Sequence, residues 1–342
     1  MPTGMAGVCR TAAVRSMTCA VHGRPHERGH IHADATRINR TLNRSDKERR
    51  MNIWQFGDVR VDRVLEFEQP LLGWQQLFPA ATTAAVDRQR AYLEPCWMEP
   101  GTGKLVMSFH SFLIRSRGLN ILVDTCGGND KPRPNKSRYH MQQWPYLERL
   151  RAAGVAPEEI DFVLCTHLHV DHVGWNTRLV NGRWVPTFPQ AKYVFARTEW
   201  DYWREHYKTE AFKDDPFYID SVLPVIDAGQ AQFVDSNFAF NDEVALVPTP
   251  GHTPGHVCVN IRSKGTECVM TGDMMHHALQ VGEPEWSSCF CVDPKQSALS
   301  RRGLFERYAG TPTVILPAHF ATPTAGTIER AGSTWRYRFQ GT

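Results

Sequence analysis

The chain of 342 residues contains no stretch that approaches eighteen consecutive apolar residues, so no membrane-spanning helix is expected. Its first fifty residues also lack the apolar core that a secretory signal requires. The nine cysteines are odd in number and scattered along the sequence, a pattern that is not typical of a disulfide framework in a chain of this length. These three absences predict a protein of a reducing compartment, and we expect the cytoplasm.

Positive charge is concentrated at the start of the chain. Residues 1–50 carry ten basic and four acidic side chains, whereas the whole chain has a net charge of +3, so residues 51–342 carry about −3. A body of that charge lacks the basic surface of a dedicated nucleic-acid binder, and we expect no nucleic-acid and no membrane partner. Residues 1–50 also show no sustained apolar period. We interpret them as a disordered or non-native extension, and residues 51–342 as a single domain.

Beyond Met51 the sequence alternates short apolar runs with helical patterns. We expect strands at 53–56, 59–67, 105–114, 119–123, 161–165, 192–196, 244–247, 257–261, 268–271 and 313–316, and a closing hairpin over 327–339. The helices are expected at 140–153, from a Thr198 cap to about 208, and at 295–308. Two strand-rich halves that are each covered by helices predict an α/β fold, a four-layer αββα sandwich.

The densest group of chemically active side chains follows the expected buried strand at 161–165. It reads Thr166-His167-Leu168-His169-Val170-Asp171-His172. A solvated loop rarely uses three histidines in six residues, and a core histidine normally stands alone. Because loops at a sheet edge commonly carry functional residues, this segment predicts a metal site.

Three more metal-binding side chains each follow a strand. They are His252 in a Pro/Gly/His loop, Asp273 in Thr271-Gly272-Asp273, and His319 in Pro317-Ala318-His319. Imidazole and carboxylate ligands suit zinc and other borderline first-row metals. Seven ligands are too many for one tetrahedral ion but suit two ions that share a bridge, so we expect a dinuclear site.

The HxHxDH motif, followed by separate His, Asp and His residues, resembles the metallo-β-lactamase superfamily over about residues 105–320. The resemblance implies an αββα sandwich with two metal ions at one sheet edge. It also implies a role for each residue: His167, His169 and His252 would bind the first metal, Asp171, His172 and His319 the second, and Asp273 would bridge both.

This sequence differs from the motifs of several branches of the superfamily, and these differences reduce the number of functions that the resemblance implies. The class B β-lactamases usually have Cys or Ser at the position of Asp273, which disfavours β-lactamase activity here. Quorum-quenching lactonases place a Tyr three residues after the bridging Asp. This chain has His276 there, as methyl parathion hydrolase does. Single-iron sulfur dioxygenases share the HxHxDH stretch and stay open as an alternative.

The function expected from the sequence is a dinuclear, zinc-dependent hydrolase in which a metal-bridging hydroxide opens a lactone or cleaves an ester. Phosphotriester hydrolysis is the main alternative; a β-lactamase and a mononuclear iron sulfur dioxygenase are further ones. We expect two Zn²⁺ per chain, with Mn, Fe or Co as substitutes, and a small-molecule substrate with an electrophilic carbonyl or phosphoryl group. A homodimer is an expectation from the resemblance alone.

Several residues around the motif have narrower expected roles. Asp171 would also orient the hydroxide, and His276, or else His277, would donate a proton or hydrogen bond to the substrate. Asp124 would brace a ligand histidine, and His256 would order its loop without binding metal. We expect Cys289 and Cys291 to be buried thiols and the Trp200–Trp203–Tyr207 stripe to pack. The aromatic residues near the site loops could line an apolar pocket, although each by itself is more typical of the core; they are Trp175, Phe188, Trp286, Phe290 and Phe320.

Overall fold

A computed structural model describes residues 52–209 and 216–341. The expected extension at residues 1–50 lies outside these ranges. Within them, no helix combines the length and the apolar character that crossing a membrane would require.

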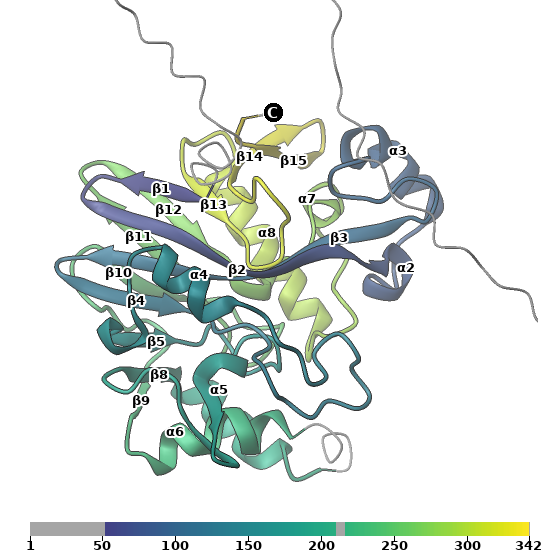
Figure 1. The fold of residues 1–342 in the computed structure, drawn as a ribbon. Helices are drawn as coiled ribbons and strands as arrows, with labels where there is room; N and C mark the ends of the chain where they lie inside the picture. Colours follow the sequence, from purple (N-terminus) through teal and green to yellow (C-terminus); the bar gives the residue numbers. More distant parts are fainter. Residues whose placement is uncertain (1–51, 210–215, 342) are drawn as a thin grey trace, which may run out of the picture. The chain divides into compact units, whose positions relative to one another are not determined.

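The first half of the described chain forms a seven-stranded sheet (Figure 1). In spatial order its strands are β1 (Ile53–Phe56), β2 (Val59–Gly73), β3 (Lys104–Ser116), β4 (Leu119–Val123), β5 (Phe162–Leu164), β8 (Lys192–Ala196) and β9 (Ala231–Val234). Strands β1 to β4 pair antiparallel, and β4, β5, β8 and β9 pair parallel. Because parallel strands end at the same edge, the loops that follow β4, β5 and β8 begin side by side.

The second half forms a six-stranded sheet. In spatial order it contains β10 (Val244–Pro248), β11 (Val257–Ser263), β12 (Thr266–Met270), β13 (Val314–Leu316), β14 (Gly326–Ala331) and β15 (Thr334–Phe339). Strands β12 and β13 pair parallel, and the other neighbouring strands pair antiparallel. The parallel pair brings the loops after β12 and β13 to one edge of this sheet as well.

The two sheets pack face to face around a shared apolar core. Phe112 and Ile114 of β3 lie in the same buried cluster as Val257 and Val259 of β11. The intervening residue Leu113 belongs instead to the cluster beneath the outer helices. Because successive side chains of a strand point to opposite faces, this alternation means that each sheet is covered on both sides.

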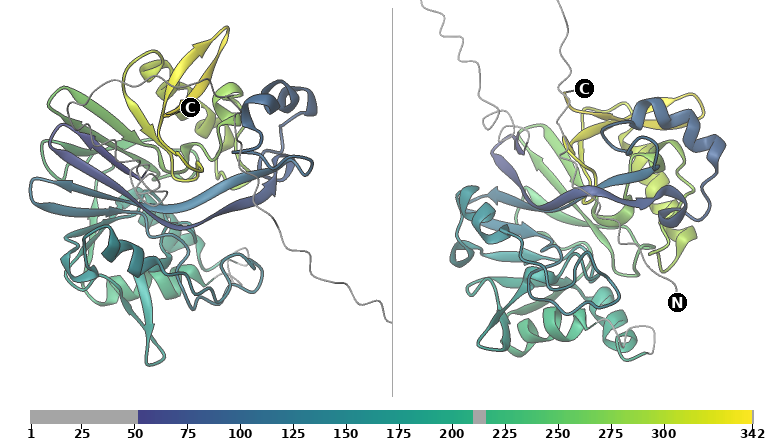
Figure 2. Two further views of the ribbon diagram at one scale, coloured as in Figure 1. Left: turned by 45° about the horizontal axis from the view of Figure 1, so that its top comes forward. Right: turned by 45° about the vertical axis from the view of Figure 1, so that its right-hand side comes forward.

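Helices cover the outer faces of the two sheets (Figures 1 and 2). In the first half α4 (Tyr146–Ala152) packs on β2 and α5 (Arg197–His206) on β8 and β9; in the second, α8 (Pro294–Tyr308) packs on β14. The remaining α-helices of the described residues are α2 (Trp74–Leu77), α3 (Thr83–Leu93), α6 (Leu223–Asp227) and α7 (Leu279–Gly282). The described chain also contains the 3-10 turns η1 (Pro157–Glu159), η2 (Gly174–Asn176) and η5 (Gly272–Met274), and the π-helix η4 (Tyr218–Val222). The expected αββα sandwich is confirmed.

Two helices begin at residues other than those expected from the sequence. The helix expected from residue 140 begins at Tyr146, after Pro145; a proline disfavours helical conformation in the residue before it. Helix α5 begins at Arg197, and its N-cap is Ala196 without a side-chain cap, so Thr198 is not the cap. A hairpin of β6 (Thr177–Val180) and β7 (Arg183–Pro186) was not expected.

Candidate metal centre

The predicted metal ligands all lie on loops that begin where a strand ends. The HxHxDH segment follows β5, the His252 loop follows β10, Asp273 follows β12 and His319 follows β13. The chain from β10 onward belongs to the second sheet, so each sheet contributes part of the group. The structure therefore brings together all seven predicted residues, which are separated by up to 152 positions in the sequence.

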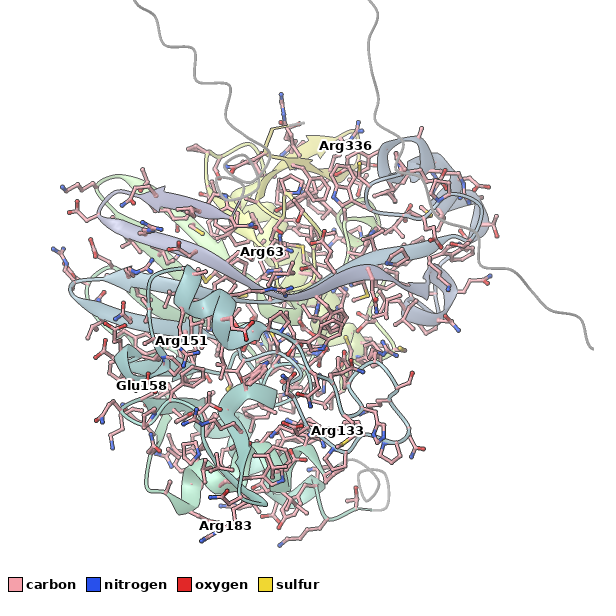
Figure 3. The ribbon with its side chains drawn as sticks, viewed as in Figure 1. Arg63, Arg133, Arg151, Glu158, Arg183 and Arg336 are labelled. Carbon is pink, nitrogen blue, oxygen red and sulfur yellow. The ribbon has the colours of Figure 1, made fainter. Side chains whose placement is uncertain are left out.

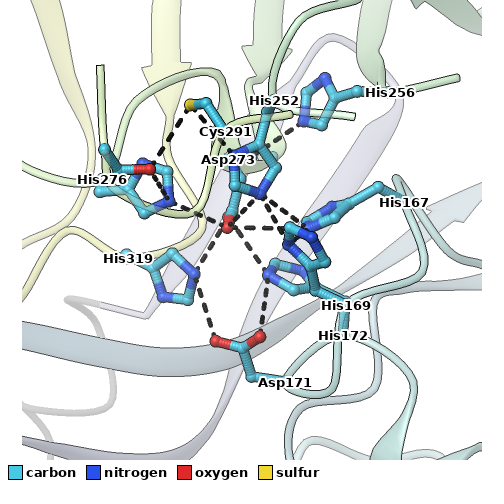
Figure 4. Close-up of polar contacts among 12 residues, drawn as sticks. His167, His169, Asp171, His172, His252, His256, Asp273, His276, Cys291 and His319 are labelled. Carbon is cyan, nitrogen blue, oxygen red and sulfur yellow. Dashed lines mark hydrogen bonds and ion pairs between the residues drawn. The ribbon is translucent and has the colours of Figure 1, made fainter. Parts of the chain in front are cut away.

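Three histidines form the first group, with Asp273 beside them (Figure 4). His167 Nε2 lies 3.0 Å from His169 Nδ1, and His252 Nε2 lies 3.1 Å and 2.9 Å from those two atoms. Each nitrogen either carries a proton or does not, so among three mutually close nitrogens at least two are in the same state. One pair must therefore face proton to proton or lone pair to lone pair. A cation that accepts all three lone pairs removes this conflict, so the donors fit a metal.

The second group contains Asp171, His172 and His319. Asp171 Oδ1 lies 3.9 Å from His172 Nε2, and Asp171 Oδ2 lies 3.8 Å from His319 Nε2. These distances are too long for hydrogen bonds. His172 Nε2 is moreover buried without a hydrogen-bond partner among the described residues, which also fits a site built for a cation.

Asp273 lies between the two groups and points one oxygen at each. Its Oδ2 is 3.2 Å from His252 Nε2, whereas its Oδ1 is 3.2 Å from His172 Nε2 and 3.0 Å from His319 Nε2. The carboxylate is buried, with 3% of the residue exposed. A single carboxylate that faces both donor sets is the arrangement that a bridging ligand requires.

Burial keeps the first group of histidines in the form that can donate a lone pair. It lowers the pKa of His169 to about 4 and the pKa values of His167 and His252 well below the ordinary value. For His172 and His319, burial acts in the same direction, but the nearby carboxylates outweigh it and raise the pKa. Asp273 is the largest of these raising influences on both imidazoles.

Neighbouring side chains hold the histidines in place. Asp124 accepts a hydrogen bond from His172 Nδ1 at 2.9 Å, as expected, and also accepts one from the Thr166 backbone N–H at 2.8 Å. The His319 Nδ1 donates to the Ser108 carbonyl at 3.0 Å. Such contacts orient imidazole ligands and raise their basicity.

His256 hydrogen-bonds to the site through the backbone, and its ring packs on the His167 imidazole with ring centroids 5.3 Å apart. Its Nε2 accepts a hydrogen bond from the Asp273 backbone N–H at 3.0 Å, and its Nδ1 lies 2.9 Å from Thr249 Oγ1. Gly272 is required beside it, because a Cβ there would lie 2.6 Å from His256 Nε2 and the backbone φ is +48°. His256 thus orders the loop that carries Asp273, as the sequence led us to expect.

The two adjacent histidines His276 and His277 point in different directions. His276 Nε2 lies 3.2 Å from Asp273 Oδ2 and 3.3 Å from Ser288 Oγ (Figure 4). His277 Nε2 donates to the Trp97 carbonyl at 2.8 Å, and the ring is buried away from the seven predicted ligands. Of the two, only His276 can reach a molecule bound at the cluster.

The cluster opens into a cavity of about 300 Å³. Polar side chains at its floor include His169, Asp171, Asp273, His276 and His319. Its walls are mainly apolar and are formed by Leu72, Met107, Phe109, Tyr139, Val170, Trp203, Phe217, Phe290 and Val292, with Lys136, Arg138 and Cys291 among them. The cavity can exclude water from an apolar part of a small molecule while a polar group contacts the floor.

Some of these lining residues differ from the expectation. Of the five aromatic residues that could line a pocket but were each more typical of the core, Phe290 lines this cavity and the other four lie in the buried core. Trp203, expected only to pack, forms part of the wall. Cys289 is exposed and Cys291 is half-buried, so the expectation of buried thiols is wrong. Both cysteines lie on the loop before α8, and Cys291 lines the cavity.

Two functional contacts were missed by sequence reasoning. Tyr139 lines the cavity and donates a hydrogen bond from its hydroxyl to Asp171 Oδ2 at 2.9 Å. Glu199 is buried and accepts a hydrogen bond from the backbone N–H of Leu168, inside the HxHxDH segment. Neither residue belongs to a motif. The only sequence signal for the role of Glu199 was its position among apolar residues. An acidic side chain that is buried in such a place needs polar partners.

A family model and several known proteins match this chain. The model of the metallo-beta-lactamase superfamily matches residues 110–319. The N-acyl homoserine lactonase AttM of Rhizobium radiobacter is 29% identical over 175 residues, which are 44% of this chain and 58% of that lactonase. An N-acyl homoserine lactonase of a Bacillus species is 28% identical over 34% of this chain and 38% of its own length. The chain thus matches about half the length of these curated relatives.

Solved structures with the same fold include two hydrolases. The hydrolase AbOPH of the beta lactamase superfamily superposes with a TM-score of 0.70 at 23% identity, over 85% of this chain and 97% of that one. AidC, a dizinc quorum-quenching lactonase, superposes with a TM-score of 0.66 at 18% identity and the same coverage. At these identities the likeness concerns the fold.

Proposed function

Because the chain belongs to the metallo-beta-lactamase superfamily, we propose that it is a hydrolase, a dinuclear metal-dependent enzyme that opens a lactone or cleaves an ester. The observation that carries the proposal is the position of Asp273, whose two oxygens face two separate groups of donors. A mononuclear site needs no such carboxylate. This geometry therefore favours two ions over the single iron of a sulfur dioxygenase.

We assign each ion a set of donors from the two groups. His167, His169 and His252 would hold the first, Asp171, His172 and His319 the second, and Asp273 both. Zinc suits these imidazole and carboxylate donors, and Mn, Fe or Co are accepted by the same donor types. A pair of such ions supplies hydroxide near neutral pH and polarises the oxygen of the scissile group.

The chain's own residues would position and protonate the reactants. The Tyr139 hydroxyl holds Asp171 Oδ2, so Asp171 Oδ1 is left to accept a hydrogen bond from the attacking water. His276 faces the same floor and would donate a proton or a hydrogen bond from Nε2 to the substrate. The apolar wall would bind a hydrocarbon part of the substrate and keep bulk water away from the reacting bond.

Phosphotriester hydrolysis is the second candidate, and one observation favours it. His276 stands where the resemblance to methyl parathion hydrolase has a histidine and lactonases have a tyrosine, and the side chain faces the cavity. The same set of residues can stabilise negative charge that develops on a phosphoryl oxygen or on a carbonyl oxygen. The two candidates thus differ in substrate, not in the residues used.

Metal quantification combined with a substrate panel tests the proposal. The full chain, purified without added metal and then loaded with Zn²⁺, should hold two ions and hydrolyse members of a panel of lactones, aryl esters, a phosphotriester and a cephalosporin. Asp273→Ala should lose at least one ion and most of the turnover. One ion per wild-type chain, or unchanged turnover in Asp273→Ala, would contradict the dinuclear mechanism. The most rapidly hydrolysed member decides between the lactone or ester and phosphotriester candidates.

A further inference from the structure

Glu199, in the first turn of α5, is a buried carboxylate with three donors around it. Only 1% of the residue is exposed. Its Oε1 accepts hydrogen bonds from the Leu168 backbone N–H at 2.9 Å and from the Trp203 indole N–H at 2.7 Å. Its Oε2 accepts one from the Gly255 backbone N–H at 2.9 Å. A buried charge is tolerated when such hydrogen bonds replace water.

Two of the three donors belong to the segments that carry the first group of histidines, and the third, Trp203 of α5, packs on one of these histidines. Leu168 lies between His167 and His169 in the sequence, and Gly255 lies three residues after His252. The Trp203 ring packs edge-to-face on the His169 imidazole, with ring centroids 5.5 Å apart. The Glu199 carboxylate therefore holds three parts of the site together. They are the backbone around His167 and His169, the Trp203 ring beside His169, and the loop after His252.

The backbone at Gly255 lies in direct contact with the backbone at Glu199. A Cβ at Gly255 would lie 2.2 Å from the Glu199 backbone nitrogen and 2.5 Å from its Cα. The start of α5 therefore lies directly against the His252 loop, and only glycine fits between them. A carboxylate in this position sets the separation of two loops that come from different sheets.

The chain contains a second carboxylate with the same donor set. Glu66 of β2 is also 1% exposed and accepts hydrogen bonds from two backbone N–H groups and one indole: Gly127 at 2.9 Å, Gly128 at 3.0 Å and Trp175 at 2.7 Å. None of these donors contacts His167, His169 or His252. Glu66 is thus a matched control for the loss of a buried, triply bonded carboxylate.

From these contacts we propose that Glu199 is the positioning residue of the first metal subsite. It holds His167, His169 and His252 at the separation that lets one ion contact all three. This inference rests on the proposed dinuclear function. The inference goes beyond that function because it assigns the zinc affinity of the first subsite, and not that of the second, to a residue that binds neither metal nor substrate.

Zinc titration of the full chain tests this inference without any substrate. A His319→Ala background weakens the second subsite, so the remaining zinc reports on the first. In that background Glu199→Gln should weaken zinc binding by about 10- to 100-fold, the range seen when residues that orient metal ligands are changed. Glu66→Gln in the same background should leave the zinc affinity unchanged. Equal isotherms for the two double variants would overturn the inference.

A milder variant covers the case in which Glu199→Gln does not fold, which circular dichroism would report. Trp203→Phe keeps an aromatic ring beside His169 but removes the indole donor to Glu199. In the His319→Ala background it should lower zinc affinity several-fold, and an unchanged affinity would overturn the inference. A wild-type chain that binds two zinc ions but hydrolyses nothing would contradict the proposed function alone, because the titration does not depend on turnover.

Discussion

At the scale of single residues, His276 offers the most direct test of the proposed chemistry. Its Nε2 faces Asp273 and the cavity, whereas His277 next to it is bonded to the Trp97 carbonyl. We expect His276→Ala to lower kcat by about 100-fold, at the lower end of what a general acid contributes, with both zinc ions retained. His277→Gln should keep kcat close to wild type. The measurement is steady-state kinetics with metal content; equal losses in both variants would exclude the role given to His276.

Cys291 allows a chemical test of access to the site. The thiol lines the cavity, and its Sγ lies 3.5 Å from His252 Nδ1; Cys289 is exposed. An alkyl group on Cys291 would occupy part of a cavity of only about 300 Å³. We expect iodoacetamide to inactivate Cys289→Ala as fast as wild type and to leave Cys291→Ala active. The reverse pattern of sensitivity, measured as residual activity over time, would show that the cavity is not the substrate's route.

The metal-site residues and the residues around them differ in how far they could be predicted. The seven predicted ligands stood out because four of them fall within six positions, and the others follow strands. Tyr139 and Glu199 carry no such signal, since their partners Asp171 and Leu168 are 32 and 31 residues away in the sequence. Their contacts arise only when the loops fold onto one another, which spacing along a single sequence does not encode.

At the scale of secondary-structure elements, we expect the Glu66 carboxyl to make the stability of the folded state depend on pH. Glu66 ties β2 to the loop after β4, and burial raises the pKa of its carboxyl to about 7 despite three hydrogen-bond donors. From pH 4.5 to 7 the folded chain keeps a proton that the unfolded chain has released, so the stability of the folded state falls as pH rises through this range. The shift corresponds to about 3 kcal/mol.

Comparison with Glu66→Gln isolates this contribution. Because the amide does not titrate, the difference in unfolding free energy between wild type and Glu66→Gln should decline from pH 4.5 to 7 and then stay constant. Denaturant unfolding of the metal-free chains at each pH measures it. A difference that rises with pH over this range would mean that Glu66 is ionised in the folded chain throughout.

Strands were predicted more accurately than helix ends. β1, β4 and β8 have the bounds expected from their apolar runs. The hairpin of β6 and β7 was missed, although Asn181-Gly182 between two apolar pairs is a strong hairpin signal, and both residues have the positive φ that such a turn needs. The buried ion pair of Arg133, which is labelled in Figure 3, with Asp220 at 2.7 Å was not predicted either. Charged residues outside regular structure are ordinarily solvated.

At the scale of the whole molecule, the sandwich could be predicted from two strand-rich halves that each carry helices, but the strand order within the two sheets needed the structure. No residue of the expected metal site lies before His167, and the first sheet begins at Ile53. We therefore propose residues 51–342 as the single folded and catalytic domain. A chain that starts at Met51 should have the melting temperature, zinc content and kcat of the full chain. A loss of zinc or a melting temperature lower by several degrees would place residues 1–50 inside the functional unit.

Each donor group draws on both sheets: His167 and His169 meet His252, and Asp171 and His172 meet His319. An ion in the first subsite would therefore close a loop of 83 residues between His169 and His252, and an ion in the second a loop of 147 residues between His172 and His319. Closing a long loop removes much of the entropy of the unfolded chain, as a disulfide does. In these terms two bound ions would act as cross-links between the two sheets of the protein. Chelation should consequently loosen both halves in one cooperative transition, with neither half melting ahead of the other.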